Sequence, residues 1–264
     1  MKEEKVEIGI IGGTGVYDPG LLEDSKEVKV FTPYGRPSDL ITIGFFKGRK
    51  IAFIPRHAKG HQIPPHKINF RANIWSLKQL GVTRIIAPAA VGSLKEELKP
   101  GDIVIPDQFI DRTTCRVSSF YDGNQVCHIS TADPFCPELI EIAFNTGKDL
   151  GLPIHKGGTC IVIQGPRFST KAESKLYRSW GADIINMTIF PECVLAREAE
   201  ICYVVIATIT DYDVWKERLV SVDEIIKTLK DNVDKTRKLL EAIIPRIPKE
   251  RNCICKDALK DALI

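Results

Sequence analysis

Short apolar runs and amphipathic stretches alternate along the whole chain, and this alternation predicts an α/β protein. Runs with the length and apolar content of central strands occupy residues 84–87, 160–163, 184–187 and 203–209. Residues 40–43 and 51–54 flank Lys47-Gly48, which predicts a β-hairpin. The sheet should therefore contain several short buried strands and one hairpin.

Helical spacing fills the segments between those runs. One predicted helix ends at Gly81 and has an apolar face made by Phe70, Ile74, Leu77 and Leu80. A second stops before Gly151, with a face made by Leu139, Ile142, Ala143 and Leu150. Residues 170–173 and 221–224 are capping-box sequences, and the latter opens a long helix. We expect one domain over residues 1–264, with a central mixed β-sheet flanked by helices and a tail from about residue 246.

The first apolar run leads directly into Gly12-Gly13-Thr14-Gly15. Glycines allow positive φ and let backbone N–H groups approach a ligand, and Thr14 adds a hydroxyl donor. A dinucleotide fingerprint would need a glycine where Asp18 stands, followed by a helix. The loop therefore predicts a site for a phosphate-like anion.

Composition and charge narrow the class of protein. A chain of 264 residues with 44% apolar content can bury a large core, and a net charge of +3 argues against an extended nucleic-acid footprint. Residues 1–5 are charged and lack the apolar segment of a signal peptide, and the longest apolar run, near 201–209, is about half a membrane span. We expect a soluble, cytoplasmic protein that binds neither nucleic acid nor membrane.

Polar side chains and small residues follow the apolar runs, at the strand ends where α/β proteins bind ligands. They are Thr14, Arg56-His57, the segment from Ala89 and Ala90 to Ser93, Asn186-Met187-Thr188, and Asp211-Tyr212-Asp213. Arg56 offers a planar fork to an oxyanion and His57 a further donor, whereas Asp211 and Asp213 offer acceptors. One pocket with a cationic end and an acidic end suits a phosphate that meets a base.

Each of these groups also has a simpler interpretation. Arg56 and His57 could form a surface ion pair, and Asp211 and Asp213 could cap the next segment. Met187, which follows a buried strand, would by default belong to the core. We favour a binding site because polar side chains follow several of the predicted strands, and not only one.

Longer motifs follow one another in a fixed order: residues 12–15, Arg56-His57, 92–94 with 100–104, 107–113, 165–169, 180–183, 186–188 and 211–213. In this order they resemble the 5′-methylthioadenosine phosphorylases of the trimeric purine nucleoside phosphorylase family. The resemblance runs from about residue 8 to about residue 240 and leaves the tail uncovered. It implies a pentosyltransferase that converts 5′-methylthioadenosine and phosphate to adenine and 5-methylthioribose 1-phosphate, in purine and methionine salvage, without a cofactor.

The resemblance also implies roles for individual residues. Phosphate would contact Thr14, Arg56, His57, the backbone around Ala90, and Thr188. Ala89 departs from the family, which usually has a threonine there, so one hydroxyl donor is missing. The substrate would contact Asn186, Met187 at the ribose, Phe168 and Ser169 beside the base, and Val222, Ile225 and Ile226 around the methylthio group. His128 would reach the 5′ end from the adjacent subunit of a homotrimer or homohexamer.

The chemistry of N-glycosidic cleavage agrees with these roles. The enzyme must place phosphate beneath the anomeric carbon and neutralise the charge that develops on the leaving purine. A protonated Asp211, its pKa raised by burial and by Asp213, would supply N7 with a proton. Acidic side chains accept from the 6-amino group of adenine and repel a 6-oxo group, and adenosine is expected as a further substrate.

Other functions remain as alternatives at this point. They are a broader phosphorylase acting on inosine and guanosine, a nucleoside hydrolase, a nicotinamide-dependent dehydrogenase, and a nucleoside-binding protein without turnover. Dependence of adenine release on phosphate separates the phosphorylases from the hydrolase.

Eight cysteines in a cytoplasmic chain would ordinarily be buried free thiols. Scarce Gln, Asn and Met beside 37 Lys and Arg lean toward a thermophile, in which intracellular disulfides occur. We predict a bridge between Cys136 and Cys202, and a second in which Cys253 or Cys255 pairs with the other or with Cys193. The Cys253-Ile254-Cys255 pair has no partner pair at zinc-site spacing, so no metal site is predicted.

Overall fold

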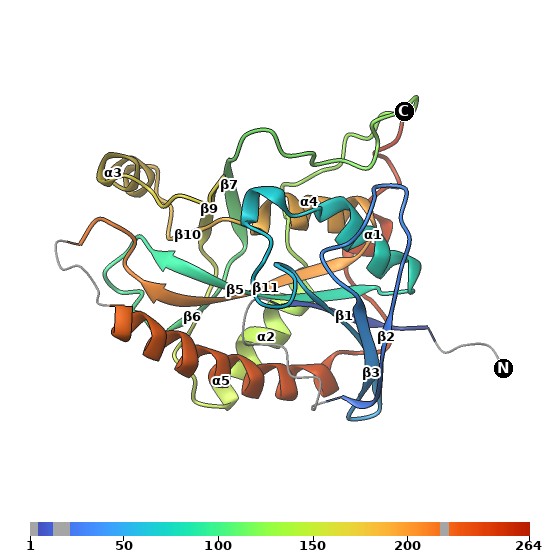
Figure 1. Ribbon diagram of the computed structural model, residues 1–264, viewed down its shortest axis with the longest axis horizontal. Helices are drawn as coiled ribbons and strands as arrows, with labels where there is room; N and C mark the ends of the chain where they lie inside the picture. Colours follow the sequence, from blue (N-terminus) through green and yellow to red (C-terminus); the bar gives the residue numbers. More distant parts are fainter. Residues whose placement is uncertain (1–4, 13–21, 217–221) are drawn as a thin grey trace.

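A mixed sheet forms the centre of the molecule in the computed structural model, which describes residues 5–12, 22–216 and 222–264 (Figure 1). Its described strands are β1 (Ile8–Gly12), β2 (Glu23–Val28), β3 (Ile41–Phe46), β4 (Arg49–Pro55), β5 (Arg84–Ser93), β6 (Ile103–Ile105), β7 (Gln108–Arg112), β8 (Ile154–Lys156), β9 (Thr159–Ile163), β10 (Ile184–Asn186) and β11 (Cys202–Asp211). The predicted buried runs correspond to β5, β9, β10 and β11, and the predicted hairpin to β3 and β4.

Strand β5 organises the sheet. The main path runs β2-β3-β4-β1-β5-β10-β9-β7, and β11 leaves it by pairing with β5 and then β6, which pairs with β8. Both β1 and β11 are parallel to β5, whereas β10 is antiparallel to its last residues, Gly92 and Ser93. Strands β4, β1 and β11 therefore end at the same edge of the sheet, next to the end of β5.

Helices cover both faces of the sheet. The helical segments are η2 (Pro65–Lys67), α1 (Phe70–Gln79), α2 (Pro137–Asp149), α3 (Lys171–Ser179), α4 (Ile189–Glu198), α5 (Val222–Arg246) and η3 (Ile254–Asp257). Figure 1 shows α2 and α5 below the sheet and α1 with α4 above it, and each of these two pairs of helices is in contact. No helix in the described ranges is long and apolar enough to cross a membrane.

Local sequence signals explain where these helices begin and end. Gly81 has a φ of 93° just after α1, a conformation that glycine adopts at little cost. At α3, the Thr170 hydroxyl accepts from the Glu173 N–H while the Glu173 carboxylate accepts from the Thr170 N–H, so the predicted capping box is present. The capping box predicted at residues 221–224 begins at Ser221, outside the described residues, whereas α5 itself is present.

The core lies between the sheet and its helices. β-Branched residues of β1, β4 and β5 are fully buried, among them Ile8, Ile51 and Ile85. Each such side chain contributes about 1.5–3 kcal/mol relative to an exposed one. This burial fixes the strand registers, because a slip by one residue would turn every apolar side chain to the other face.

Several elements were not predicted from the sequence, among them β2, β6, β7 and β8. The β2 segment has no apolar alternation and was not predicted, yet its backbone pairs antiparallel with β3 at the edge of the sheet. The tail, to which the sequence analysis assigned no structure, packs on the core, since Ile247 and Ala262 are buried. The Arg84 guanidinium donates to the carbonyls of Lys249 and Glu250, so polar contacts that no local pattern reveals also hold the tail.

Candidate functional site

The end of β5 brings the predicted site residues together. The Pro88 carbonyl accepts from Arg56 Nη1 at 3.1 Å, and the Ala90 carbonyl accepts from Asn186 Nδ2 at 3.0 Å. Gly92 lies opposite Asp211 in the pairing of β5 with β11. Four residues of strand span about 13 Å, so β5 separates the arginine from the aspartates along one line. The cationic and acidic groups therefore lie apart along one strand.

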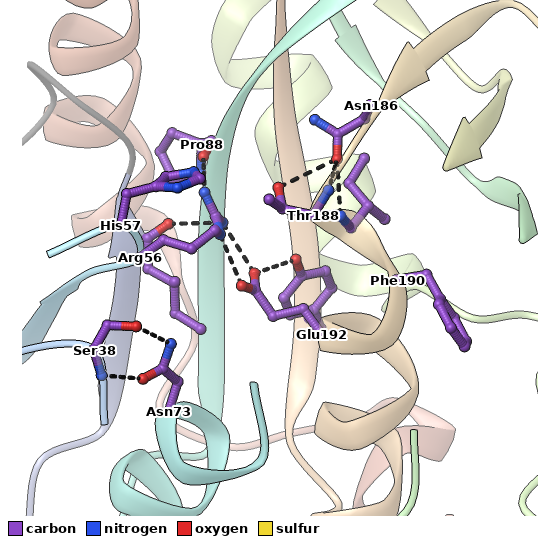
Figure 2. Close-up of polar contacts among 12 residues, drawn as sticks. Ser38, Arg56, His57, Asn73, Pro88, Asn186, Thr188, Phe190 and Glu192 are labelled. Atoms are coloured by element: carbon purple, nitrogen blue, oxygen red, sulfur yellow. Dashed lines mark hydrogen bonds and ion pairs between the residues drawn. The ribbon is translucent and has the colours of Figure 1, made fainter. Parts of the chain in front are cut away.

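Arg56 is the most constrained of these side chains, at 2% exposure. Its Nε and Nη2 donate to the two carboxylate oxygens of Glu192, at 2.7 and 2.9 Å, and Nη2 also donates to the Ile11 carbonyl (Figure 2). Burial opposes the charge on Arg56, but the Glu192 carboxylate outweighs it and raises the guanidinium pKa. With Pro88 these partners take up four N–H groups of the five, leaving one on Nη1 for a ligand.

Glu192 is a site residue that the sequence analysis missed. It is 0% exposed in α4, just after Phe190, whose φ of −95° and ψ of 135° kink the chain. The Tyr203 hydroxyl donates to Glu192 Oε2 at 2.8 Å and so holds the carboxylate from β11. A lone glutamate among the apolar residues 189–196 was the available signal, because such a charge needs a buried partner. The surface ion pair considered for Arg56 is thus wrong.

His57 is half-buried beside Arg56 and has the electrostatics of a neutral imidazole. Desolvation lowers its pKa to about 4, with Arg56 acting in the same direction and the bond to Ile63 opposing it. Nδ1 lies 2.9 Å from the Ile63 carbonyl, which only accepts, so Nδ1 carries the proton and Nε2 is an acceptor. This differs from the predicted role of His57 as a donor to an anion. The His61 ring stacks on it at 4.2 Å.

Asn186 and Thr188 shape the neighbouring corner, where β10 ends and α4 begins (Figure 2). Asn186 Oδ1 accepts from the Thr188 N–H at 2.6 Å, the Thr188 hydroxyl at 3.2 Å and the Ile189 N–H at 2.8 Å. Since its amide also donates to Ala90, Asn186 chiefly positions Thr188 against β5. The Thr188 hydroxyl makes the longest of these bonds and can turn to a ligand.

Asp211 and Asp213 form the acidic end. Asp211 Oδ2 accepts from the Thr210 hydroxyl at 2.6 Å and Oδ1 from the Asp213 N–H at 2.7 Å. Burial raises the pKa of both carboxyls; Asp211 contributes to the rise at Asp213, whereas the Asp213 N–H opposes the rise at Asp211. A Cβ at Gly92 would lie 3.2 Å from Asp211 Oδ1 and 2.9 Å from Ile185, so only glycine fits there easily.

The remaining predicted contacts fall into four groups. Ser169 is 8% exposed, and its hydroxyl has no partner among the described residues, which leaves it free for a ligand. Met187 packs beside the 165–166 turn, since a Cβ at Gly165 would lie 2.6 Å from its sulfur. Phe168 (74% exposed) and His128 are open to solvent in the single chain. Thr14 and the side chains of Val222, Ile225 and Ile226 lie outside the described residues.

Ala89 stands where the family pattern usually has a threonine. Ala89 is buried, whereas Ala90 is exposed at the strand end. The Thr208 hydroxyl of the adjacent β11 lies 3.4 Å from the Ala89 carbonyl. A hydroxyl is therefore present near this edge although residue 89 supplies none.

All eight cysteines are described and are free thiols. Cys136, Cys202, Cys253 and Cys255 are buried, with their sulfur atoms within 4.8 Å of one another. Cys193 is buried within α4 and does not belong to this group, so the structure gives no support to its pairing with the tail. The bridge between Cys136 and Cys202 remains a prediction.

A family model described as the phosphorylase superfamily matches residues 7–245. The chain belongs to this superfamily. It is 62% identical to the S-methyl-5'-thioadenosine phosphorylase of Nitrosopumilus maritimus over 98% of this chain and 99% of the relative. It is 57% identical to the protein of that name from Pyrococcus abyssi, over 97% and 99%.

Solved structures of the superfamily have the same fold. A methylthioadenosine phosphorylase from an antarctic soil metagenomic library superimposes with a TM-score of 0.95 at 44% identity, covering 99% of this chain and 93% of that one. The Schistosoma mansoni methylthioadenosine phosphorylase in complex with adenine gives 0.90 at 39% identity, covering 97% and 96%. A mutant of the latter was solved with methylthioadenosine, at the same TM-score, identity and coverage.

The raised pKa of Asp211 predicts a pH-dependent effect of Asp211→Asn on stability. The stabilisation from this carboxyl is complete below its ordinary pKa of 3.8 and is lost as pH rises through the higher folded value. The amide has no such loss, so the variant should have a higher Tm than the wild type at pH 7 by calorimetry. The difference should shrink toward pH 4. The exposed control Asp133→Asn should show neither effect, and an equal difference at both pH values would contradict the assignment.

Proposed function

We propose that this protein catalyses the phosphorolysis of 5′-methylthioadenosine to adenine and 5-methylthioribose 1-phosphate. The observation that carries the proposal is the order of anchoring points along β5, with Arg56 bound at Pro88, Asn186 at Ala90 and Asp211 paired with Gly92. Relatives that bear this enzyme name span nearly the whole chain, and structural neighbours hold adenine or methylthioadenosine. The pentosyl transfer needs phosphate as a co-substrate and no cofactor.

Phosphate would be held by directed hydrogen bonds more than by net charge. Arg56 is neutralised by Glu192 and has one N–H to offer, and the Thr188 hydroxyl and the backbone around Ala90 add donors. The acceptor Nε2 of neutral His57 would accept a hydrogen bond from the O–H group of a monoprotonated phosphate. The phosphate oxygens that carry no proton would then face the anomeric carbon. The positive charge of the oxocarbenium-like transition state attracts them there.

The acidic end would read and activate the base. Burial favours a protonated carboxyl on Asp211 or Asp213, and such a group can donate to N7 as the glycosidic bond breaks. An acceptor oxygen beside the 6-amino group favours adenine over 6-oxopurines. Ser169, whose buried hydroxyl has no protein partner among the described residues, would contact the same base.

The sugar would lie between these ends, against Met187 of the segment that joins β10 to α4. We infer that the 5′ end is closed by Val222, Ile225 and Ile226 and by His128 of the adjacent subunit. The exposure of Phe168 and His128 in the single chain suits this arrangement, because a neighbouring subunit would cover both. A trimer, alone or paired into a hexamer, supplies that neighbour.

Adenine release with and without phosphate tests the proposal directly. Chromatography should show adenine from 5′-methylthioadenosine only when phosphate is present, together with an equal amount of sugar phosphate. Adenine formed equally fast without phosphate would instead identify a nucleoside hydrolase.

Arg56→Lys should raise the KM for phosphate because an ammonium cannot keep four acceptors and still face the ligand. We expect an increase of about 30- to 150-fold, about 2–3 kcal/mol, with little change in the KM for the nucleoside. Arg49→Lys is the control, since Arg49 pairs with Glu7 away from the site. Steady-state rates over a phosphate series measure both constants, and equal phosphate KM values would remove Arg56 from the site.

Asp211→Asn should move the preference for the base from adenine nucleosides toward inosine. An amide can donate to a 6-oxo group, whereas a carboxylate meets it lone pair to lone pair. The ratio of kcat/KM for methylthioadenosine to that for inosine should fall at least about tenfold. Asp133→Asn should leave the ratio unchanged; an unchanged ratio in Asp211→Asn would mean that Asp211 does not read the base.

Co-expression of His128→Ala with Asp213→Ala tests the shared site. Each homo-oligomer should be impaired, but mixed rings contain sites with both native side chains, about a quarter of the total for random assembly. Activity at low methylthioadenosine should therefore exceed the sum of the two separate variants. Mixing two preparations of one variant is the control, and no gain over that control would place His128 outside the neighbouring site.

A further inference from the structure

The four-cysteine cluster lies apart from the candidate site and has no role in the proposed reaction. We propose that Cys136, Cys202, Cys253 and Cys255 bind one structural Zn²⁺ ion that fastens the C-terminal tail to the core. The sulfur atoms all lie within 4.8 Å of one another, and those of Cys202 and Cys253 are 3.3 Å apart. Four sulfurs about 2.3 Å from a common tetrahedral centre would be about 3.8 Å apart, so small movements admit the ion.

The donor set fits zinc. Thiolates are soft ligands, and a closed tetrahedral set of four is typical of structural zinc. All four side chains are buried, with exposures of 1%, 0%, 7% and 3% in sequence order, which leaves no open position for a water. The sequence analysis predicted no metal because no second pair stands at zinc-site spacing from Cys253 and Cys255. The fold supplies it from the start of α2 and the start of β11.

The surroundings compensate the charge that zinc binding would leave. Four thiols lose their protons on binding, so the centre carries a net charge of −2. Arg197 is 7% exposed, and its Nη1 lies 3.9 Å from Cys255 Sγ, while its Nε is fixed by the Ser130 carbonyl at 2.9 Å. Cys136 is the N-cap of α2 with no side-chain capping bond, so its sulfur is available and lies at the positive end of the helix.

The cluster also stands where a cross-link has a structural effect. Cys253 and Cys255 flank the start of η3, and the last residues of the chain pair with residues 126–128. A metal bound to both tail cysteines would restrain that pairing through the core residues Cys136 and Cys202. The inference does not rest on the proposed function, because the metal touches none of the residues placed at substrate.

Metal analysis of the full chain is the first test. Protein purified under reducing conditions without chelator, after incubation with Zn²⁺ and desalting, should contain about one zinc per chain by mass spectrometry. Cys253→Ser/Cys255→Ser should retain less than a tenth of that zinc. Cys160→Ser is the matched control, since Cys160 is a fully buried cysteine outside the cluster, and it should keep the full amount. Equal zinc in the double variant, or none in the native chain, would overturn the proposal.

Cobalt gives a readout that does not depend on a folded variant. Co²⁺ exchanged into the native protein should show the visible bands of a tetrahedral thiolate centre. Removal of zinc by chelation should lower the Tm of the native protein and of Cys160→Ser but not that of the double variant. Iron bound in place of zinc would also overturn the proposal. So would disulfides between Cys136 and Cys202 and between Cys253 and Cys255, detected by quenching cells with acid and then alkylating the free thiols.

Discussion

The buried ion pair of Arg56 and Glu192 is the interaction on which the site depends. It joins the end of β4 to α4, and its further bonds reach Ile11 of β1, Pro88 of β5 and Tyr203 of β11. Removing one partner of such a pair costs about 3–5 kcal/mol because the other charge is left uncompensated. The strand ends of the candidate site are thus held in place by the same bonds that stabilise the fold.

The pair also sets the electrostatics of the pocket. A cation already balanced by a carboxylate, next to a histidine whose pKa is lowered to about 4, creates little net attraction for an anion at neutral pH. Selectivity must then come from where the donors point, which the fixed fork of Arg56 and the corner formed by Asn186 decide. Modest attraction suits a site that must also release a sugar phosphate, since equal tightening of ground and transition states would not raise kcat.

The sequence predicted the parts of this arrangement that are local. Buried runs of four to seven residues identify β5, β9, β10 and β11, and the rule that ligands bind at strand ends then points to Arg56, Thr188 and Asp211. Glu192 was not predicted, because it meets Arg56 across 136 positions of chain that only the fold brings together. The sequence also could not predict which ring nitrogen of His57 carries the proton, since this depends on the Ile63 carbonyl. The polar β2 strand gave no periodic signal at all.

The tail shows how a remote element can bear on the candidate site. The His128 N–H donates to the Ala262 carbonyl at 2.8 Å, and Val126 exchanges backbone bonds with Ile264. Residues 126–128 therefore take their conformation from the last residues of the chain, which in turn are anchored where Cys253 and Cys255 enter the core. If His128 reaches a neighbouring site, loosening the tail should affect binding of the 5′ group of the substrate without touching Arg56 or Asp211. In the proposed oligomer the tail would thus be coupled only to the 5′ end of the pocket, through its backbone pairing with residues 126–128.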